Sequence, residues 1–183
     1  IEYVPCASEA VACSTAAGLK MSGQNPIVIV QSSGLTNMAS CITSLLVPYG
    51  ITFPIITSWR TYSEGDSEIQ HQHLASKLPD LIHAYGYDYE IIDQHDVSVV
   101  LDQINNAKTT NTILVLKKGT FSTVHLNQEF ELDLASRVPR SEYLKALHRN
   151  YRDSDDLFIG TTGNTAREMY TFMASTNNFY MAG

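Results

Sequence analysis

A lone carboxylate near the start of the chain is the first group that could do chemistry. Between Ala7 and Gly18 nearly every side chain is small or apolar, and Glu9 carries the only charge. Burying a carboxyl group is costly without a partner, and apolar surroundings raise its pKa. Glu9 could simply favour the first turn of a helix capped by Ser8. Alternatively, it could protonate or polarise a group on a ligand.

A second candidate is the segment QSSGLTN, residues 31–37, which follows an apolar run and opens a predicted helix. Ser33 and Gly34 fall where an open α/β sheet exposes backbone N–H groups at the end of a strand. The segment matches neither GxGxxG nor the P-loop pattern. It is therefore either a tight strand-to-helix turn or a ligand-binding loop.

The same strand–turn–helix arrangement returns in FIGTTGNTARE, residues 158–168. The hydroxyl and backbone donors of Thr161, Thr162 and Gly163 could seat a phosphate at a helix N-terminus. The alternative is ordinary helix capping, because Thr165 and Glu168 have capping-box spacing.

Two histidines open another predicted helix after a polar loop, residues 58–68. His71 and His73 are two residues apart, so they point to different faces of the helix, which argues against a shared metal ion. A single active-site histidine and a solvated helix-cap histidine both remain open.

These residues must be positioned by alternating strands and helices. The periodicity predicts strands at 1–5, 26–31, 53–57, 88–92, 111–119 and 156–160, with another beginning at 178; it predicts helices from Ser8 to Met21 and at 35–46, 70–85, 97–107, 139–151 and after 163. The all-apolar run at 26–31 is typical of a strand buried in a parallel sheet. This order predicts an α/β fold with an open, mainly parallel sheet flanked by helices.

The pattern lapses once along the chain, which indicates two domains. Residues 1–119 form one α/β unit, 120–136 read as an irregular linker, and 137–183 begin a second α/β domain that is cut off. The sequence opens without an initiator Met, so we expect that upstream chain is missing.

Composition narrows the function classes. The net charge is −7 and the Lys and Arg residues are scattered, which argues against nucleic-acid binding. No apolar run is long enough to span a membrane, and no secretory signal is visible. Cys6, Cys13 and Cys41 are odd in number and lack CxxC spacing, which favours buried thiols in a reducing cytoplasm.

Taken together, SEAVACSTAAG, VIVQSSGLTNMAS, ITSWR, EIQHQH, LVLKKGTF and TTGNTARE…FYMAG resemble, in this order, the phosphonopyruvate decarboxylases and the related sulfopyruvate decarboxylases. These are thiamine-diphosphate enzymes. The resemblance implies the thiamine-diphosphate-binding fold, with 1–119 as a pyrimidine-binding domain lacking its first strand and helix. It further implies that 137–183 begin the pyrophosphate-binding domain, whose GDG…N metal motif falls outside this sequence.

The resemblance also assigns roles by position. It implies that Glu9 hydrogen-bonds the aminopyrimidine ring of the cofactor and shares a proton with it, and that His71 acts beside it in catalysis. The implied cofactor-binding residues are Ser33, Gly34 and Leu35 at the pyrimidine, Thr161, Thr162 and Gly163 at the diphosphate, and Met181 and Gly183 at the aminopyrimidine. Trp59 and Arg60 are the implied substrate-binding residues, with Arg60 placed to bind an anion. No metal ligand is implied within these residues.

The function implied is a cytoplasmic lyase of phosphonate biosynthesis. It would use thiamine diphosphate and Mg²⁺ to convert 3-phosphonopyruvate to phosphonoacetaldehyde and carbon dioxide. We expect a homodimer or homotetramer with active sites at subunit interfaces and a small 2-oxo acid as substrate, with no nucleic-acid or membrane partner. Two alternatives stay open: a sulfopyruvate decarboxylase, and a non-catalytic homologue that acts as an assembly or ligand-binding subunit.

Overall fold

The chain divides into two compact units, Ile1–Thr123 and Val124–Gly183. The computed structural model describes residues 2–61, 69–93, 96–122, 124, 137–161, 163–173 and 178–182. The division between the units falls within the predicted linker, of which only residues 120–122 and 124 are described. The assignment of the units as pyrimidine- and pyrophosphate-binding domains stays a prediction.

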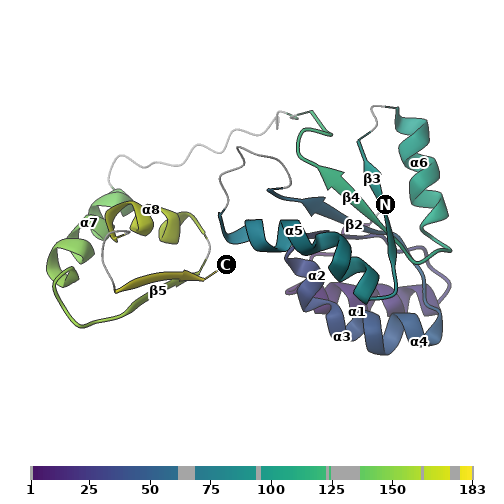
Figure 1. Cartoon of the computed structure of the whole chain (residues 1–183), viewed down its shortest axis with the longest axis horizontal. Coiled ribbons are helices and arrows are strands. Elements are labelled where there is room, and N and C mark those ends of the chain that lie inside the picture. The colour runs from purple at the N-terminus through teal and green to yellow at the C-terminus, as the bar shows by residue number, and fades with distance from the viewer. Residues whose placement is uncertain are drawn as a thin grey trace. The chain divides into compact units, whose positions relative to one another are not determined.

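The first unit is built on a parallel sheet (Figure 1). Its elements are α1 (Glu9–Met21), β1 (Val28–Gln31), α2 (Gly34–Asn37), α3 (Ala39–Cys41), η1 (Ile42–Leu46), α4 (Val47–Tyr49), β2 (Ile55–Trp59), α5 (Ile69–Ala84), β3 (Asp88–Ile92), α6 (Val97–Asn106) and β4 (Thr112–Lys117). The strands lie in the order β1-β2-β4-β3, and all three pairings are parallel. This confirms the predicted open α/β sheet.

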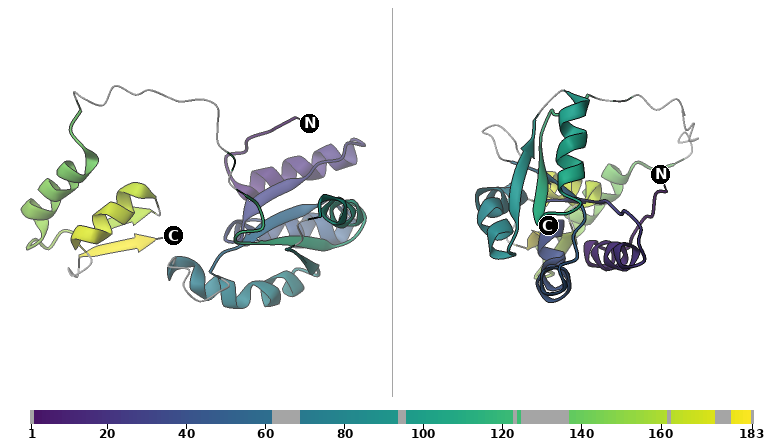
Figure 2. Two further views of the ribbon diagram at one scale, coloured as in Figure 1. Left: turned by 90° about the horizontal axis from the view of Figure 1, so that it is seen from above. Right: turned by 90° about the vertical axis from the view of Figure 1, so that its right-hand side faces the viewer.

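Helices cover both faces of this sheet, and the two faces are packed unequally. A large core joins α1, the α2–η1 segment and α5 to one face; it includes Cys13, Leu35, Ile42, Ile55 and Ile82. A smaller core of Ile56, Ile92, Ala107 and Leu114 lies between the other face and α6. Figures 1 and 2 show α6 on one side of the strands and α5 on the other.

β1 is an edge strand. Its all-apolar sequence predicted burial on both faces, but only one face is buried. Val28 is buried, but Ile29 is 74% exposed. Successive side chains of a strand point to opposite faces, and the core beneath α6 is formed by β2, β3 and β4 without β1. Ile29 therefore has no helix over it among the described residues.

The predicted helix at 35–46 is interrupted and longer than expected. Helical structure runs from Gly34 to Tyr49, with a π-helical turn at Ile42–Leu46 in which the Val47 N–H donates to the Ile42 carbonyl. Pro48 follows directly and has no N–H to continue the ordinary ladder, which favours such a turn. Gly50, with φ of 61°, then ends the segment.

Two predicted strands are also corrected. Residues 2–5 form no strand, and Tyr3 is 86% exposed, because none of the described strands pairs with them. β2 begins at Ile55 rather than residue 53, after Pro54, and continues through Trp59. Ser58 and Trp59 therefore belong to the sheet and not to the predicted polar loop, whose residues 62–68 lie outside the described ranges.

The predicted helix ends at Ser8 and Gly86 are confirmed. The Val11 N–H donates to Ser8 Oγ at 3.3 Å, which caps α1. Gly86 has a φ of 78° and follows α5, and the Tyr87 N–H donates back to the Ile82 carbonyl at 3.2 Å. A residue at positive φ with such a bond is a common helix C-terminus.

The second unit contains α7 (Arg140–Tyr151), β5 (Phe158–Thr161), α8 (Asn164–Met173) and β6 (Phe179–Ala182). β5 and β6 pair in parallel, and Leu144, Met169 and Met173 form its core. The capping box suggested for Thr165 and Glu168 is wrong, because α8 already begins at Asn164. Instead, the Glu168 carboxylate accepts two hydrogen bonds from Arg140, at 2.6 and 3.0 Å.

Among the described residues, no helix is both long and apolar enough to cross a membrane. The three cysteines are free thiols. Cys13 is fully buried, and burial together with the neighbouring Cys41 thiol raises its pKa. Cys6 and Cys41 are only half-buried, so the expectation of buried thiols holds fully for Cys13 alone.

Candidate functional site

Glu9 lies at the first turn of α1, against the backbone of Gly34. A Cβ atom placed on Gly34 would lie 2.5 Å from Glu9 Cγ and 2.9 Å from Glu9 Oε1. These distances are shorter than real side-chain contacts, so only glycine permits this approach. Asn37, one helical turn after Gly34, donates from Nδ2 to Glu9 Oε2 at 2.9 Å. The QSSGLTN segment therefore holds the carboxylate on two sides.

The pKa of Glu9 is lower than that of an ordinary glutamate, which corrects the prediction of a raised pKa. The hydrogen bond from Asn37 is the largest cause, a bond from the backbone N–H of Glu9 adds to it, and partial burial opposes both. The small residues around Glu9 in the sequence do not enclose it, because it remains half-exposed. Glu9 is consequently ionised at neutral pH and can accept a hydrogen bond.

Gln31 links the QSSGLTN segment to His71, a role that the sequence did not predict. Its Nε2 donates to Ser33 Oγ at 3.0 Å and lies 3.1 Å from His71 Nε2. His71 is buried, at 7% exposure, whereas His73 is exposed, as expected for two different faces of α5. The Gln31 amide therefore bridges the Ser33 hydroxyl and the His71 imidazole.

Leu35 belongs to the core. Its side chain is fully buried, and its carbonyl accepts a hydrogen bond from the Tyr85 hydroxyl at 3.1 Å. This bond ties the start of α2 to the end of α5, and burial raises the pKa of Tyr85. Leu35 thus anchors the loop that carries Ser33 and Gly34.

Trp59 and Arg60 stand at the carboxyl end of β2 and line an open pocket of about 610 Å³. The Trp59 indole N–H donates to the Ala75 carbonyl at 3.0 Å, and its ring meets Tyr89 edge-on at 6.2 Å between centroids. Trp59 is therefore fixed against α5. Gln31 also lines the pocket, which places the pocket beside the Ser33–Gln31–His71 chain.

The remaining predicted residues belong to the second unit. Thr161 ends β5 and Gly163 directly precedes α8, while Thr162 lies outside the described residues. Met181 is a half-buried residue of β6 paired with Gly160, and Gly183 lies outside the described residues. A Cβ on Gly160 would lie 2.9 Å from Ala166 Cβ, so glycine lets α8 pack closely on β5.

The first unit thus brings together Glu9, Ser33, Gly34 and His71, and Gln31 connects them to Trp59 and Arg60. Asn37 and Gln31 are the two partners not predicted, although both lie within the QSSGLTN segment. Their polar amide side chains at the two ends of a strand-to-helix turn were the available signal. No cluster of three or more His, Cys, Asp or Glu side chains suited to a metal ion occurs among the described residues.

The chain is 28% identical to a phosphonopyruvate decarboxylase of Streptomyces viridochromogenes across 99% of the chain and 50% of that protein. It is 26% identical to a phosphonopyruvate decarboxylase of Streptomyces hygroscopicus across 99% of the chain and 49% of that protein.

The chain is a relative of these decarboxylases. A sulfopyruvate decarboxylase of Methanosarcina acetivorans is 33% identical over 50% of the chain and 25% of that protein. No protein-family profile matches the chain. The chain spans about half the length of the phosphonopyruvate decarboxylases it matches.

Proposed function

We propose that this chain belongs to a thiamine-diphosphate-dependent decarboxylase that converts 3-phosphonopyruvate to phosphonoacetaldehyde and carbon dioxide. The observation that carries the proposal is the similarity to two phosphonopyruvate decarboxylases over 99% of the chain. The similarity to a sulfopyruvate decarboxylase covers half of the chain and keeps sulfopyruvate as the second candidate substrate.

The residues of the first unit fit thiamine diphosphate. This cofactor supplies an electron sink for the carbanion left when carbon dioxide leaves a 2-oxo acid. Its aminopyrimidine ring needs a partner that can hold a proton on a ring nitrogen. Glu9 suits this role because it is ionised and half-exposed, with Oε2 bonded to Asn37 and Oε1 beside a glycine.

The proposal assigns a role to each candidate site residue of the first unit. Glu9 accepts the hydrogen bond of the ring nitrogen, and Gly34 leaves space for this carboxylate. Gln31, held by Ser33, positions the His71 imidazole beside the loop. Gln31, Trp59 and Arg60 face the substrate in the adjoining pocket.

The turn between β5 and α8 suits the diphosphate. Thr161 ends β5 and Gly163 directly precedes α8, where the backbone N–H groups and the dipole of a helix N-terminus favour an anion. Met181 lies on the neighbouring strand β6, paired with Gly160, and is proposed to contact the aminopyrimidine of the cofactor. Mg²⁺, cytoplasmic location and a homodimer or homotetramer with shared active sites belong to the same proposal.

The test is carbon dioxide release by the full-length protein, supplied in parallel with 3-phosphonopyruvate and sulfopyruvate. We expect turnover of 3-phosphonopyruvate that requires both thiamine diphosphate and Mg²⁺. Release from sulfopyruvate alone would replace the first substrate by the second. Cofactor binding without release from either acid would favour a non-catalytic homologue and refute the decarboxylase proposal.

A further inference from the structure

A proline lies in the interior of α5, at position 79 of a helix that runs from Ile69 to Ala84. In a regular helix each N–H donates to the carbonyl four residues earlier. Proline has no N–H, and its ring crowds that same carbonyl, so this bond cannot form. The carbonyl concerned belongs to Ala75, which therefore lacks its usual helical donor.

Trp59 supplies a donor to this carbonyl from outside the helix. Its indole N–H donates to the Ala75 carbonyl at 3.0 Å. Ala75 is a buried residue, and a buried backbone carbonyl without a partner is costly. In a helix without the proline, the N–H of residue 79 would already occupy the Ala75 carbonyl. Pro79 therefore opens the acceptor that the indole uses.

This bond sets the orientation of Trp59 at the pocket. Trp59 ends β2 and lines the pocket beside Gln31. Its ring contact with Tyr89 restrains where the indole lies, whereas a hydrogen bond is directional and fixes which edge of the indole faces α5. Ala75 comes one helical turn after His71, so the same bond ties the part of α5 that carries His71 to the end of β2.

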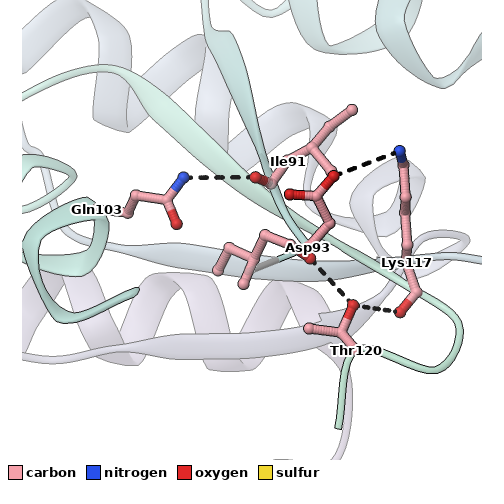
Figure 3. Close-up of polar contacts among 6 residues, drawn as sticks. Ile91, Asp93, Gln103, Lys117 and Thr120 are labelled. Carbon is pink, nitrogen blue, oxygen red and sulfur yellow. Dashed lines mark hydrogen bonds and ion pairs between the residues drawn. The ribbon is translucent and has the colours of Figure 1, made fainter. Parts of the chain in front are cut away.

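The part of the pocket formed by β4 is held by other contacts. Lys117 of β4 pairs with Trp59 in the sheet. Thr120 Oγ1 lies 2.8 Å from the Lys117 carbonyl and 3.1 Å from the Ile92 carbonyl, so its hydroxyl closes the turn after β4 onto the end of β3 (Figure 3). These contacts join β3 and β4 and do not involve α5. A change at Pro79 should therefore alter Trp59 and leave the β4 side of the pocket in place.

We propose that Pro79 is a positioning residue for the pocket: because it lacks an N–H, Trp59 can bond to Ala75 and hold its indole at the pocket wall. This inference rests on the proposed function for the identity of the pocket's occupant. An interior proline weakens a helix, so replacing it should stabilise α5 while it loosens Trp59. A purely structural role would instead predict that stability and substrate binding fall together.

The experiment follows the indole N–H of Trp59 by NMR in the full-length protein, prepared with isotope-labelled tryptophan. Trp59→Phe identifies the resonance by its loss. In Pro79→Ala the new N–H competes for the Ala75 carbonyl, so we expect the indole resonance to move upfield and to exchange faster with solvent. The KM for the 2-oxo acid should rise about fivefold with kcat unchanged, as expected for loss of one neutral hydrogen bond. The urea midpoint of unfolding should be equal to or above that of wild type.

Ser76→Ala is the matched control, because it raises helix propensity at an exposed position next to Ala75 without adding an N–H. It should leave the Trp59 resonance and the KM unchanged. Trp59→Phe removes the donor and keeps an aromatic ring. Adding Pro79→Ala to Trp59→Phe should therefore change the KM no further, because both substitutions remove the same contact.

A wild-type indole resonance and a wild-type KM in Pro79→Ala would overturn the positioning role. Additive effects of Pro79→Ala and Trp59→Phe on the KM would overturn it as well. A shifted resonance in Pro79→Ala, combined with no decarboxylation of either acid by wild type, would keep the positioning of Trp59 and refute the proposed reaction.

Discussion

At the scale of single residues, the position of Glu9 depends on the lack of a side chain at Gly34. Gly34 is buried, and the Glu9 side chain occupies the space that a Cβ would fill. The clash would involve the far part of a flexible side chain and not a second backbone segment. A larger residue at position 34 would therefore move Glu9 without disrupting the fold.

Gly34→Ala tests this arrangement. A methyl group 2.5 Å from Glu9 Cγ would force the carboxylate to move by about 1 Å, and misplacement on that scale can lower a rate by about 100-fold. We expect carbon dioxide release by the full-length protein to fall by about that factor. The urea midpoint of unfolding should stay close to that of wild type.

Gly18→Ala provides the matched control within α1. A Cβ at Gly18 meets no atom within 4 Å, so alanine should preserve activity and stabilise the helix by about 0.5–1 kcal/mol. If Gly34→Ala were as active as Gly18→Ala, the proposed role of Gly34 in positioning Glu9 would be wrong.

Residue types in the sequence singled out the candidate site residues, but did not reveal which side chains contact them. The lone charge among small residues singled out Glu9, yet its pKa is lowered because Asn37, 28 positions away, donates to it. The contact between Gln31 and His71 spans 40 positions. Such contacts follow from the pairing of elements in space, which local sequence patterns do not specify.

At the scale of elements, the close packing of α8 on β5 depends on Gly160. A Cβ there would lie 2.9 Å from Ala166 Cβ and 3.3 Å from the Phe179 ring. Both Gly160 and Ala166 are fixed to regular backbone, so neither can rotate away. Gly160→Ala should lower the free energy of unfolding by about 1–3 kcal/mol, measured by urea denaturation of the full-length protein.

A second substitution distinguishes this contact from a general effect of alanine in β5. Ala166→Gly removes the opposing Cβ, so the double variant should recover part of the lost stability beyond the sum of the single changes. Strict additivity of the two substitutions would show that the close approach of α8 to β5 is not limited by these atoms.

Sequence periodicity predicted the positions of helices and strands better than the burial of their residues. It correctly predicted β1, β3, β4, α1, α5 and α6, because each has a clear apolar pattern or a recognisable end such as Ser8 or Gly86. It failed to show that Ile29 is exposed, since an all-apolar strand at the sheet edge has the same composition as one at the centre. It also missed the π-helical turn before Pro48, which depends on backbone bonding in a buried helix.

At the scale of the whole molecule, an acidic chain brings three cationic side chains to one pocket. The net charge of the chain is −7, whereas Arg60, Lys117 and Lys118 all line one pocket. The sequence could not predict this pocket, because Lys117 ends β4 and Lys118 follows it, whereas Arg60 follows β2, more than 50 positions earlier in the chain. Parallel pairing of these strands is what brings the charges together.

The chain spans about half the length of its phosphonopyruvate decarboxylase relatives, so the complete protein is the right object for any activity measurement. The order of the motifs indicated the resemblance to these decarboxylases, and the lapse in strand–helix periodicity after residue 119 predicted two units. The substrate acid does not follow from local patterns, because substrate recognition depends on residues brought together from elements far apart in sequence.

The most direct test of the account is Glu9→Gln in the full-length protein. This change keeps the size of the side chain and removes its capacity to hold a proton, so we expect thiamine diphosphate binding within a fewfold of wild type and carbon dioxide release reduced by at least about 100-fold. Glu90→Gln, at an exposed position of β3, is the matched control and should be fully active. Near-normal decarboxylation by Glu9→Gln would contradict the central claim that Glu9 serves the cofactor.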